Sequence, residues 1–211
     1  MGLSKDPARV GGETVDSLLA RIAAPGPDGG GGAAAALTAA TSAALVAMVG
    51  GVAARHAPDD VALRDLVGDA ESLRGRLTDL IGLDAAAYRR VLEARRQPEA
   101  LRATAFRDAL IGATEVPLEV ASASGRLLDH CVTLMASARP STLADLGVAG
   151  LLAAAALEAA ALTARVNLRP LQDPAFVAEA GQRLERLRQH GGTLHARLSQ
   201  TIADQIAPAR R

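Results

Sequence analysis

Aromatic side chains are almost missing from this chain, so its hydrophobic core must be built from alanine and leucine. Of the 211 residues, 49% are hydrophobic and 1% are aromatic, and the aromatic ones are Tyr88, Phe106 and Phe176. Small side chains allow helix axes to approach closely. Strands favour alternating β-branched and aromatic residues, and no segment shows that alternation. The composition therefore predicts an all-α protein with densely packed helices.

Helical spacing of apolar residues, interrupted by proline- and glycine-rich turns, predicts a bundle of long antiparallel helices. The helices are expected at about 14–24, 33–56, 60–96, 99–138, 143–167 and 174–206. Pro117 predicts a kink or break near Glu115, and adjacent glycines at 191–192 weaken the last helix. No linker is long enough to separate two domains. We therefore expect a disordered N-terminus at 1–12 and a single helical domain at 13–207.

Charge balance and cysteine content limit the classes of function. The chain has 23 basic and 23 acidic residues and no net charge. This balance argues against a nucleic-acid binder, which would show a basic excess. The single cysteine, Cys131, excludes an internal disulfide and is expected to pack in the core, as in a reducing cytosol. Residues 1–12 are polar and lack the apolar region of a signal peptide, so a cytoplasmic location is expected.

Two apolar runs raise the question of a membrane. Residues 29–54 and 146–164 are long enough to cross a bilayer. The first run consists mostly of alanine and glycine, which insert weakly, and the second contains Glu158. Buried helices that are hydrophobic on all sides explain both runs better than spans do. No membrane partner is therefore expected, and a membrane-associated helical protein is the weaker alternative.

Four consecutive glycines at 29–32 precede an uncharged stretch at 33–54. Glycine has no Cβ, so such a loop can bring several N–H groups close to a ligand. A helix N-terminus adds unpaired donors and a positive dipole end, which favour a carboxylate, a phosphate or a polar heterocycle. No Gly-Lys-Ser/Thr follows, so this is not a nucleotide-binding P-loop. A flexible linker is an equally good explanation of the four glycines alone.

Asp84 is the acidic residue in an otherwise apolar stretch at 80–87. It is either a solvent-facing helix residue or a pocket group with a raised pKa. Tyr88 follows four residues later on the same helix face, where it can line a pocket or simply pack. The histidines predict no metal site, because His56 and His130 are isolated and the spacing of His190 and His195 does not suit two ligands on one helix face.

Five segments of the chain, taken in order, resemble the cyclodeaminase/cyclohydrolase family. This family includes the C-terminal half of formiminotransferase-cyclodeaminase and the bacterial methenyltetrahydrofolate cyclohydrolases. The resemblance extends over about residues 14–200, and the third segment, "ATEVPLEVA", matches almost letter for letter. The five segments are 18–49, 79–98, 113–121, 143–157 and 164–177.

The resemblance implies a folate one-carbon enzyme that forms an all-helical homodimer. It implies methenyltetrahydrofolate cyclohydrolase or formiminotetrahydrofolate cyclodeaminase activity, a tetrahydrofolate derivative as substrate and no permanently bound cofactor. Asp84 matches the aspartate that acts as acid and base. Together with Tyr88, the residues expected to bind substrate are Gly30, Gly31, Gly32, Glu115, Asp145, Arg165 and Asn167. The absence of a formiminotransferase half in this chain favours the cyclohydrolase.

Several of these residues also have structural explanations. Glu115 can cap the segment broken at Pro117, and Asp145 can interact with a helix dipole. Arg165 can pair with a glutamyl carboxylate of folate or with a surface acid.

Six positions depart from the residues that are usual in the family. They are Gly29, Ala33, Arg139, Ala144, Ala154 and Thr163. Together they remove hydrogen-bonding groups on which recognition of a buried ligand depends. The alternative function is therefore a divergent member without folate activity, which binds another small ligand or acts as a helical assembly partner.

Overall fold

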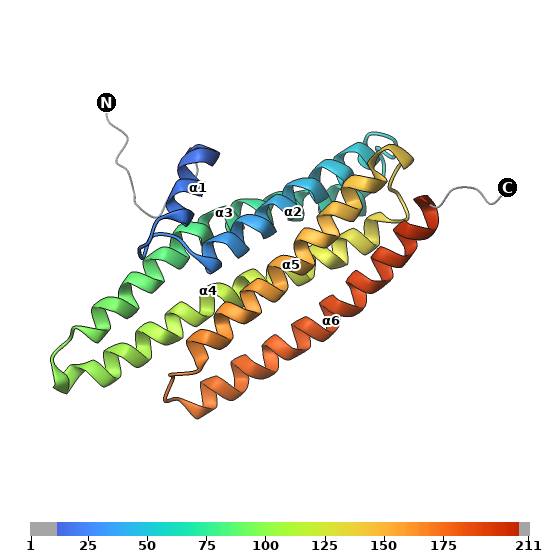
Figure 1. The fold of residues 1–211 in the computed structure, drawn as a ribbon. Coiled ribbons are helices and arrows are strands. Elements are labelled where there is room, and N and C mark those ends of the chain that lie inside the picture. The colour runs from blue at the N-terminus through green and yellow to red at the C-terminus, as the bar shows by residue number, and fades with distance from the viewer. Residues whose placement is uncertain (1–11, 207–211) are drawn as a thin grey trace.

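The computed structural model describes residues 12–206 as a bundle of long helices (Figure 1). The predicted all-α fold of antiparallel helices is confirmed, and the described residues contain no strand. The first part of the N-terminus that we predicted to be disordered, residues 1–11, lies outside the described residues. The elements are α1 (Val15–Ala23), α2 (Gly31–Ala54), α3 (Val61–Arg95), α4 (Glu99–Leu134), the short 3₁₀ turn η1 (Pro140–Thr142), α5 (Leu143–Leu168) and α6 (Pro174–Ile206).

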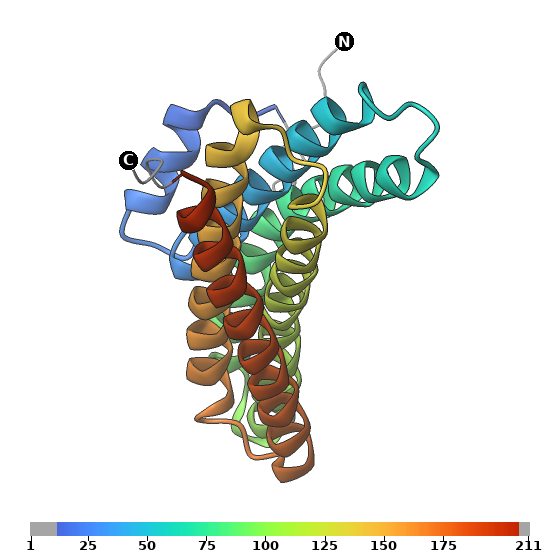
Figure 2. The same cartoon turned by 90° about the vertical axis from the view of Figure 1, so that its right-hand side faces the viewer.

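Four helices form the central bundle, and α6 is added to its outside. Helix α2 packs on α3 and α5, and α4 packs on the same two helices from the other side. Helix α6 lies along α4 and α5, as the views in Figures 1 and 2 agree. Helix α2 begins part-way along α3, so α3, α4, α5 and α6 extend beyond it at one end (Figure 1). That end carries the turn between α3 and α4 and the connection between α5 and α6.

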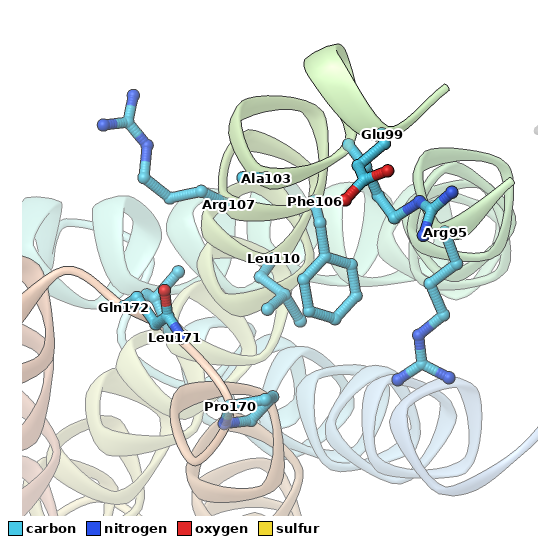
Figure 3. A pocket seen from close by; sticks show the side chains of 10 residues that line it. Arg95, Glu99, Ala103, Phe106, Arg107, Leu110, Pro170, Leu171 and Gln172 are labelled. Atoms are coloured by element: carbon cyan, nitrogen blue, oxygen red, sulfur yellow. The ribbon is translucent and has the colours of Figure 1, made fainter. Parts of the chain in front are cut away.

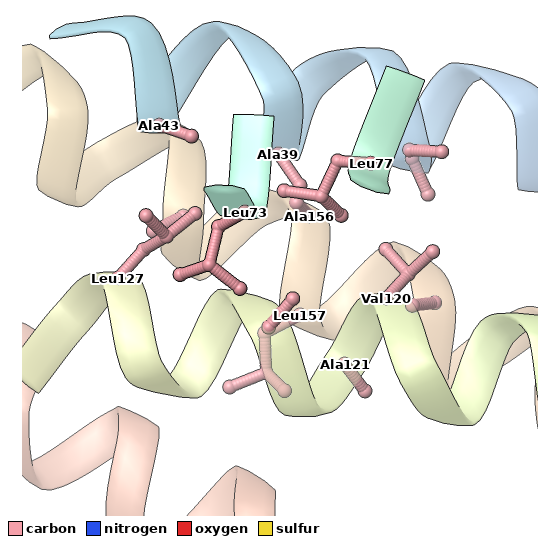
Figure 4. Packing of buried hydrophobic residues seen from close by; sticks show 14 of the residues in the cluster. Ala39, Ala43, Leu73, Leu77, Val120, Ala121, Leu127, Ala156 and Leu157 are labelled. Atoms are coloured by element: carbon pink, nitrogen blue, oxygen red, sulfur yellow. The ribbon is translucent and has the colours of Figure 1, made fainter. Parts of the chain in front are cut away.

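Alanine and leucine fill the core, as the composition predicts. Figure 4 shows leucines of α3, α4 and α5 between the small residues of α2 and α5. The hydroxyl of Ser42 on α2 donates a hydrogen bond of 2.8 Å to the backbone carbonyl of Ala149 on α5. A serine side chain reaches a neighbouring backbone only when the two helices are very close. Ala39 and Ala43 on α2 and Ala156 on α5 are fully buried and permit this approach.

The two apolar helices are core helices of this bundle. By length and composition alone, α2 and the segment Pro140–Leu168 could cross a membrane. Of their most apolar windows, 56% and 44% of the residues are buried inside the protein. Cys131 is also fully buried, and burial raises the pKa of its thiol to about 12. It therefore packs in the core, as predicted, and does not supply a reactive thiolate.

Helix α4 continues through Pro117, where the sequence predicts a kink or a break. Proline has no N–H, so the carbonyl of Ala113 loses its helical donor. The side-chain amide of Asn167 on α5 donates to this carbonyl at 2.8 Å. The break is avoided because a neighbouring helix supplies the missing hydrogen bond. The last helix is likewise continuous through Gly191, whose Cα lies close to the side chain of Leu157.

Replacing Asn167 with alanine should lower the free energy of unfolding by about 1–2 kcal/mol, because a partly buried carbonyl loses its only donor. The measurement is urea unfolding followed by circular dichroism. In a Pro117→Ala background, the N–H of residue 117 can bond to Ala113 again, so the same replacement should destabilise much less. An equal loss in both backgrounds would contradict this account of the Asn167 hydrogen bond.

Candidate functional site

The first turn of α2 has no side-chain cap of its own. Its N-cap residue is Gly30, which has a φ of 136° and makes no capping hydrogen bond. A residue with a Cβ is strained at this φ, so glycine is required here. By contrast, α1 is capped by Thr14 and α3 by Asp60, whose side chains accept from Ser17 and Leu63. The first N–H groups of α2 therefore depend on a group from elsewhere.

Asp84 of α3 provides that group. Its carboxylate accepts a hydrogen bond from the backbone N–H of Ala33. It also lies directly against Gly32, where a Cβ would stand only 2.1 Å from Oδ1 and 2.5 Å from Oδ2. No real side chain tolerates such contacts, so residue 32 must be glycine for Asp84 to keep this position. The sequence predicts a loop at 29–32, but Gly31 and Gly32 belong to the helix, whose start brings them to Asp84.

Burial raises the pKa of the Asp84 carboxyl, and the hydrogen bond from Ala33 opposes this effect only in part. Asp84 is therefore a partly buried residue and not a fully solvent-facing one. A carboxyl with a raised pKa can hold a proton closer to neutral pH than an ordinary aspartate. Such a group, placed at a helix N-terminus beside an exposed glycine, has the properties of a general acid and base.

The segment before α2 is fixed to the bundle. Asp28 forms an ion pair with Arg89 of α3, and its backbone carbonyl accepts from Arg21 of α1 at 3.1 Å. Gly29 packs so closely on α1 that a Cβ would lie 2.5 Å from the carbonyl oxygen of Arg21. The alternative of a flexible linker is therefore wrong for this segment.

Helix α5 forms the other wall of the site through Thr163. A Cβ at Gly31 would lie 3.9 Å from the Thr163 hydroxyl, which donates a hydrogen bond of 3.1 Å to the carbonyl of Ala159. Gly31 itself is exposed. The site thus combines the start of α2, Asp84 from α3 and Thr163 from α5.

Two of the other candidate residues are turned away from this site. Glu115 faces Arg183 of α6 at 3.7 Å, and Arg165 faces Glu185 of α6 at 3.5 Å, so both side chains are turned toward α6. Tyr88 lies one turn beyond Asp84 and is 48% exposed.

Asp145 is separated from the site by most of α5. It stands in the first turn of that helix, about five turns or roughly 27 Å before Thr163. Within a single chain, Asp145 therefore does not lie near Asp84.

Two of the four histidines, His130 and His190, contact carboxylates of neighbouring helices. His130 contacts Asp69 at 2.6 Å, and Arg126 pairs with the same carboxylate. The side chain of His190 contacts Asp129 at 3.0 Å. Within residues 12–206, no group of three or more His, Cys, Asp or Glu side chains could hold a metal ion.

Comparison with known proteins gives one family. The family model described as formiminotransferase-cyclodeaminase matches residues 14–186. The chain is 33% identical to methenyltetrahydrofolate cyclohydrolase of Methylorubrum extorquens, over 93% of this chain and 99% of that protein. The chain belongs to the formiminotransferase-cyclodeaminase family.

Two further matches agree with this membership. The chain is 31% identical to formimidoyltransferase-cyclodeaminase of Sus scrofa over 64% of its own length, which is 26% of that longer protein. The crystal structure of formiminotetrahydrofolate cyclodeaminase from Thermotoga maritima has the same fold, with a TM-score of 0.88. That match covers 94% of this chain and 100% of the other, at 21% sequence identity.

Four of the six positions that depart from the family's usual residues lie in two places in the fold. Ala33 and Thr163 lie at the Asp84 site. The contribution of Ala33 is its backbone N–H, which does not depend on the side chain, and Thr163 supplies a hydroxyl there. Arg139 and Ala144 lie at the other end of α5, near Asp145. The contact between Asp84 and the first turn of α2 is thus unaffected by these departures.

Replacing Asp84 with asparagine should stabilise the fold at neutral pH. A carboxyl whose pKa is raised on folding binds its proton more tightly in the folded chain, so its ionisation destabilises the fold as pH rises through that pKa. The Asp84→Asn variant should therefore melt at a higher temperature than the wild type at pH 7. The difference should disappear below the ordinary aspartate pKa of 3.8.

Thermal unfolding followed by circular dichroism at several pH values measures this effect. Asp79→Asn is a matched control, because Asp79 is an exposed residue of the same helix. The control should gain no stability at neutral pH. A lower melting temperature for Asp84→Asn at pH 7 would show that Asp84 acts mainly as a helix cap.

Proposed function

We propose that this chain is a folate one-carbon enzyme that hydrolyses 5,10-methenyltetrahydrofolate, with Asp84 as the acid and base. The observation that carries the proposal is the partly buried Asp84 carboxyl, with its raised pKa, at the start of α2. Family membership supports folate chemistry, and the relative that matches along almost its whole length is named as a cyclohydrolase. We further propose that residues 13–207 form the enzyme domain and that it acts in the cytoplasm.

The proposed reaction needs one group that moves protons beside a cation. The methenyl carbon is part of a positively charged amidinium, which a nearby carboxylate stabilises. Asp84 accepts a proton as a water oxygen attacks this carbon. A carbon–nitrogen bond of the five-membered ring then breaks, and the proton held by Asp84 goes to the departing nitrogen. The added hydroxyl releases its own proton to solvent as it becomes the carbonyl of the neutral formyl product. The exposed backbone at Gly31 leaves room for a flat heterocycle to approach α2.

The cyclodeaminase reaction is the second candidate, because the fold matches a formiminotetrahydrofolate cyclodeaminase along its whole length. In that reaction the formimino group closes the ring and ammonia leaves. The same carboxyl can donate the proton that the departing nitrogen requires. Measuring ammonia release from formiminotetrahydrofolate separates this activity from hydrolysis of the methenyl compound.

The Asp84→Asn variant should lose about a hundredfold or more in kcat, which is the usual scale for a positioned proton-transfer group, while KM changes less. The measurement is the loss of methenyltetrahydrofolate absorbance. Gly32→Ala should lower kcat as well, because the new Cβ displaces the Asp84 carboxylate. Gly31→Ala should have a smaller effect, since its Cβ meets only Thr163 at 3.9 Å. A wild type inactive on both the methenyl and formimino compounds would refute folate chemistry.

We also propose that the chain forms a homodimer through the outer faces of α2 and α5. These faces expose large apolar side chains that nothing in the described chain covers. They are Met48, Val148, Leu151, Leu162 and Val166, which are 40–66% exposed. Helix α2 carries no charged residue at all. A second copy would bury this surface in an isologous interface.

The arrangement of the dimer determines whether Asp145 can reach the site. Asp84 lies at one end of the α2–α5 face and Asp145 at the other. A two-fold axis in the interface plane and perpendicular to the helices would reverse their direction. The partner's Asp145 would then lie near Asp84, and each dimer would contain two shared sites. We propose this antiparallel arrangement because it brings together two candidate residues that a single chain keeps apart.

A complementation experiment tests the shared site. Asp84→Asn and Asp145→Asn homodimers should both be weakly active, with light-scattering masses twice the 21.5 kDa of one chain. When the two variants are refolded together in equal amounts, half of the dimers are mixed and each contains one intact site. About a quarter of wild-type activity should return. No recovery would place each site within one chain, and a monomeric mass would refute the dimer.

A further inference from the structure

A cavity lies at the end of the bundle where α3 turns into α4 and α5 turns into α6 (Figure 3). Its volume is about 420 Å³. Phe106, Leu110 and Pro170 form apolar walls that face one another in Figure 3. Arg95 and Arg102 lie at its rim. An aromatic wall beside guanidinium groups suits a ligand that joins an aromatic ring to a carboxylate.

The guanidinium of Arg95 is held at the cavity by the aromatic ring. It lies 5.2 Å from the centroid of Phe106, which leaves its N–H groups available to an anion. Arg95 forms no ion pair with any of the described residues. The Nε of Arg102 donates to the backbone carbonyl of Gln97 at 3.0 Å, which leaves its terminal nitrogens available. Arg107, also in the lining, is paired with Asp108, and Glu99 is the acidic residue of the lining.

The cavity and Asp84 lie along one face of α3. Arg95 follows Asp84 by 11 residues, which is three helical turns, or about 16 Å. Side chains three full turns apart point in nearly the same direction. Tyr88 lies between them on this face and is 48% exposed. Helix α2 begins at Gly31, opposite Asp84, so it does not extend along this part of α3.

We propose that this cavity binds the p-aminobenzoyl-glutamate end of the folate substrate while its reacting ring lies at Asp84. The inference rests on the proposed function. The aromatic ring of that unit would pack near Phe106, and its carboxylates would pair with Arg95 and Arg102. The distance along α3 from Asp84 to Arg95, less the length of an arginine side chain, is comparable to the length of the p-aminobenzoyl-glutamate unit. Arg165, the sequence-based candidate for this role, is turned toward Glu185 instead.

The test compares a substrate that carries glutamate with one that lacks it. For Arg95→Ala and Arg102→Ala, KM for methenyltetrahydrofolate should rise about tenfold or more with little change in kcat, because a charged contact shared by ground and transition states is lost. The KM for methenyltetrahydropteroate, which has no glutamate, should not change. Arg95→Lys should recover part of the loss. Arg90→Ala, an exposed arginine of the same helix outside the lining, is the matched control.

Two outcomes would overturn the proposal while leaving the proposed function intact. The first is a wild type that is active on both substrates, with Arg95→Ala affecting both equally or neither. The second is p-aminobenzoylglutamate binding, measured by calorimetry, that is the same in the wild type and in Arg95→Ala. Failure of the proposed function looks different, because the wild type would then be inactive on both substrates.

A further measurement separates the substrate's tail from a free effector anion. p-Aminobenzoylglutamate should inhibit the wild type competitively, whereas free glutamate should inhibit much more weakly. Inhibition by free glutamate that does not compete with substrate would assign the cavity to a separate effector and refute the proposal. Thermal unfolding of each variant shows whether the fold is kept.

Discussion

The contact between the Asp84 carboxylate and the first turn of α2 is the interaction on which the site depends. It caps a helix that has no capping side chain of its own, since its N-cap is Gly30. It also fixes the position along α3 at which α2 begins, because Gly32 lies directly against the carboxylate. Serine and aspartate, the usual N-cap residues, are strained at the φ of 136° that residue 30 adopts. The acceptor at this helix end therefore comes from α3.

Close helix packing makes this contact possible. The hydroxyl of Ser42 reaches the backbone of Ala149, which shows how near α2 and α5 approach. Larger side chains on α2 would move it away from α3 and α5 and would separate the Ala33 N–H from Asp84. The near absence of aromatic residues is therefore a condition for the site as well as for the fold. Phe106, one of the three aromatic residues, lies outside this tight region, in the wider cavity at the bundle's end.

The sequence predicts the helices well because apolar spacing and helix breakers are local signals. It places the start of α2 two residues late, since glycine propensity argues against a helix at Gly31 and Gly32. It also predicts a kink or a break at Pro117. The helix is not broken there, because the compensating hydrogen bond comes from Asn167, far along the chain. Both differences have the same origin, which is a contact with another helix that overrides a local preference.

The candidate site is less predictable from the sequence than the fold. Asp84 is recognisable in the sequence as an acidic residue among apolar ones. The resemblance to the family makes it the candidate acid and base. That Glu115 and Arg165 both face α6 depends on how α6 sits against α4 and α5, which no local pattern encodes. The closeness of Gly31 to Thr163 and the stacking of Arg95 on Phe106 likewise require the three-dimensional arrangement.

The direction of the Asp84 pKa shift is opposite to that expected of an ordinary helix cap. A carboxylate that only caps a helix accepts N–H groups in a solvated position, and its pKa falls because the charged form is stabilised. Asp84 accepts from Ala33, but burial outweighs that hydrogen bond and its pKa rises. Because burial disfavours the charged form of Asp84, ionisation of this carboxyl lowers the stability of the fold at neutral pH. The chain nevertheless holds an aspartate there, against a glycine at which a Cβ would overlap the carboxylate. A carboxyl whose ionisation is unfavourable is suited to exchanging a proton with a ligand, and that is the role the proposed reaction would require of it.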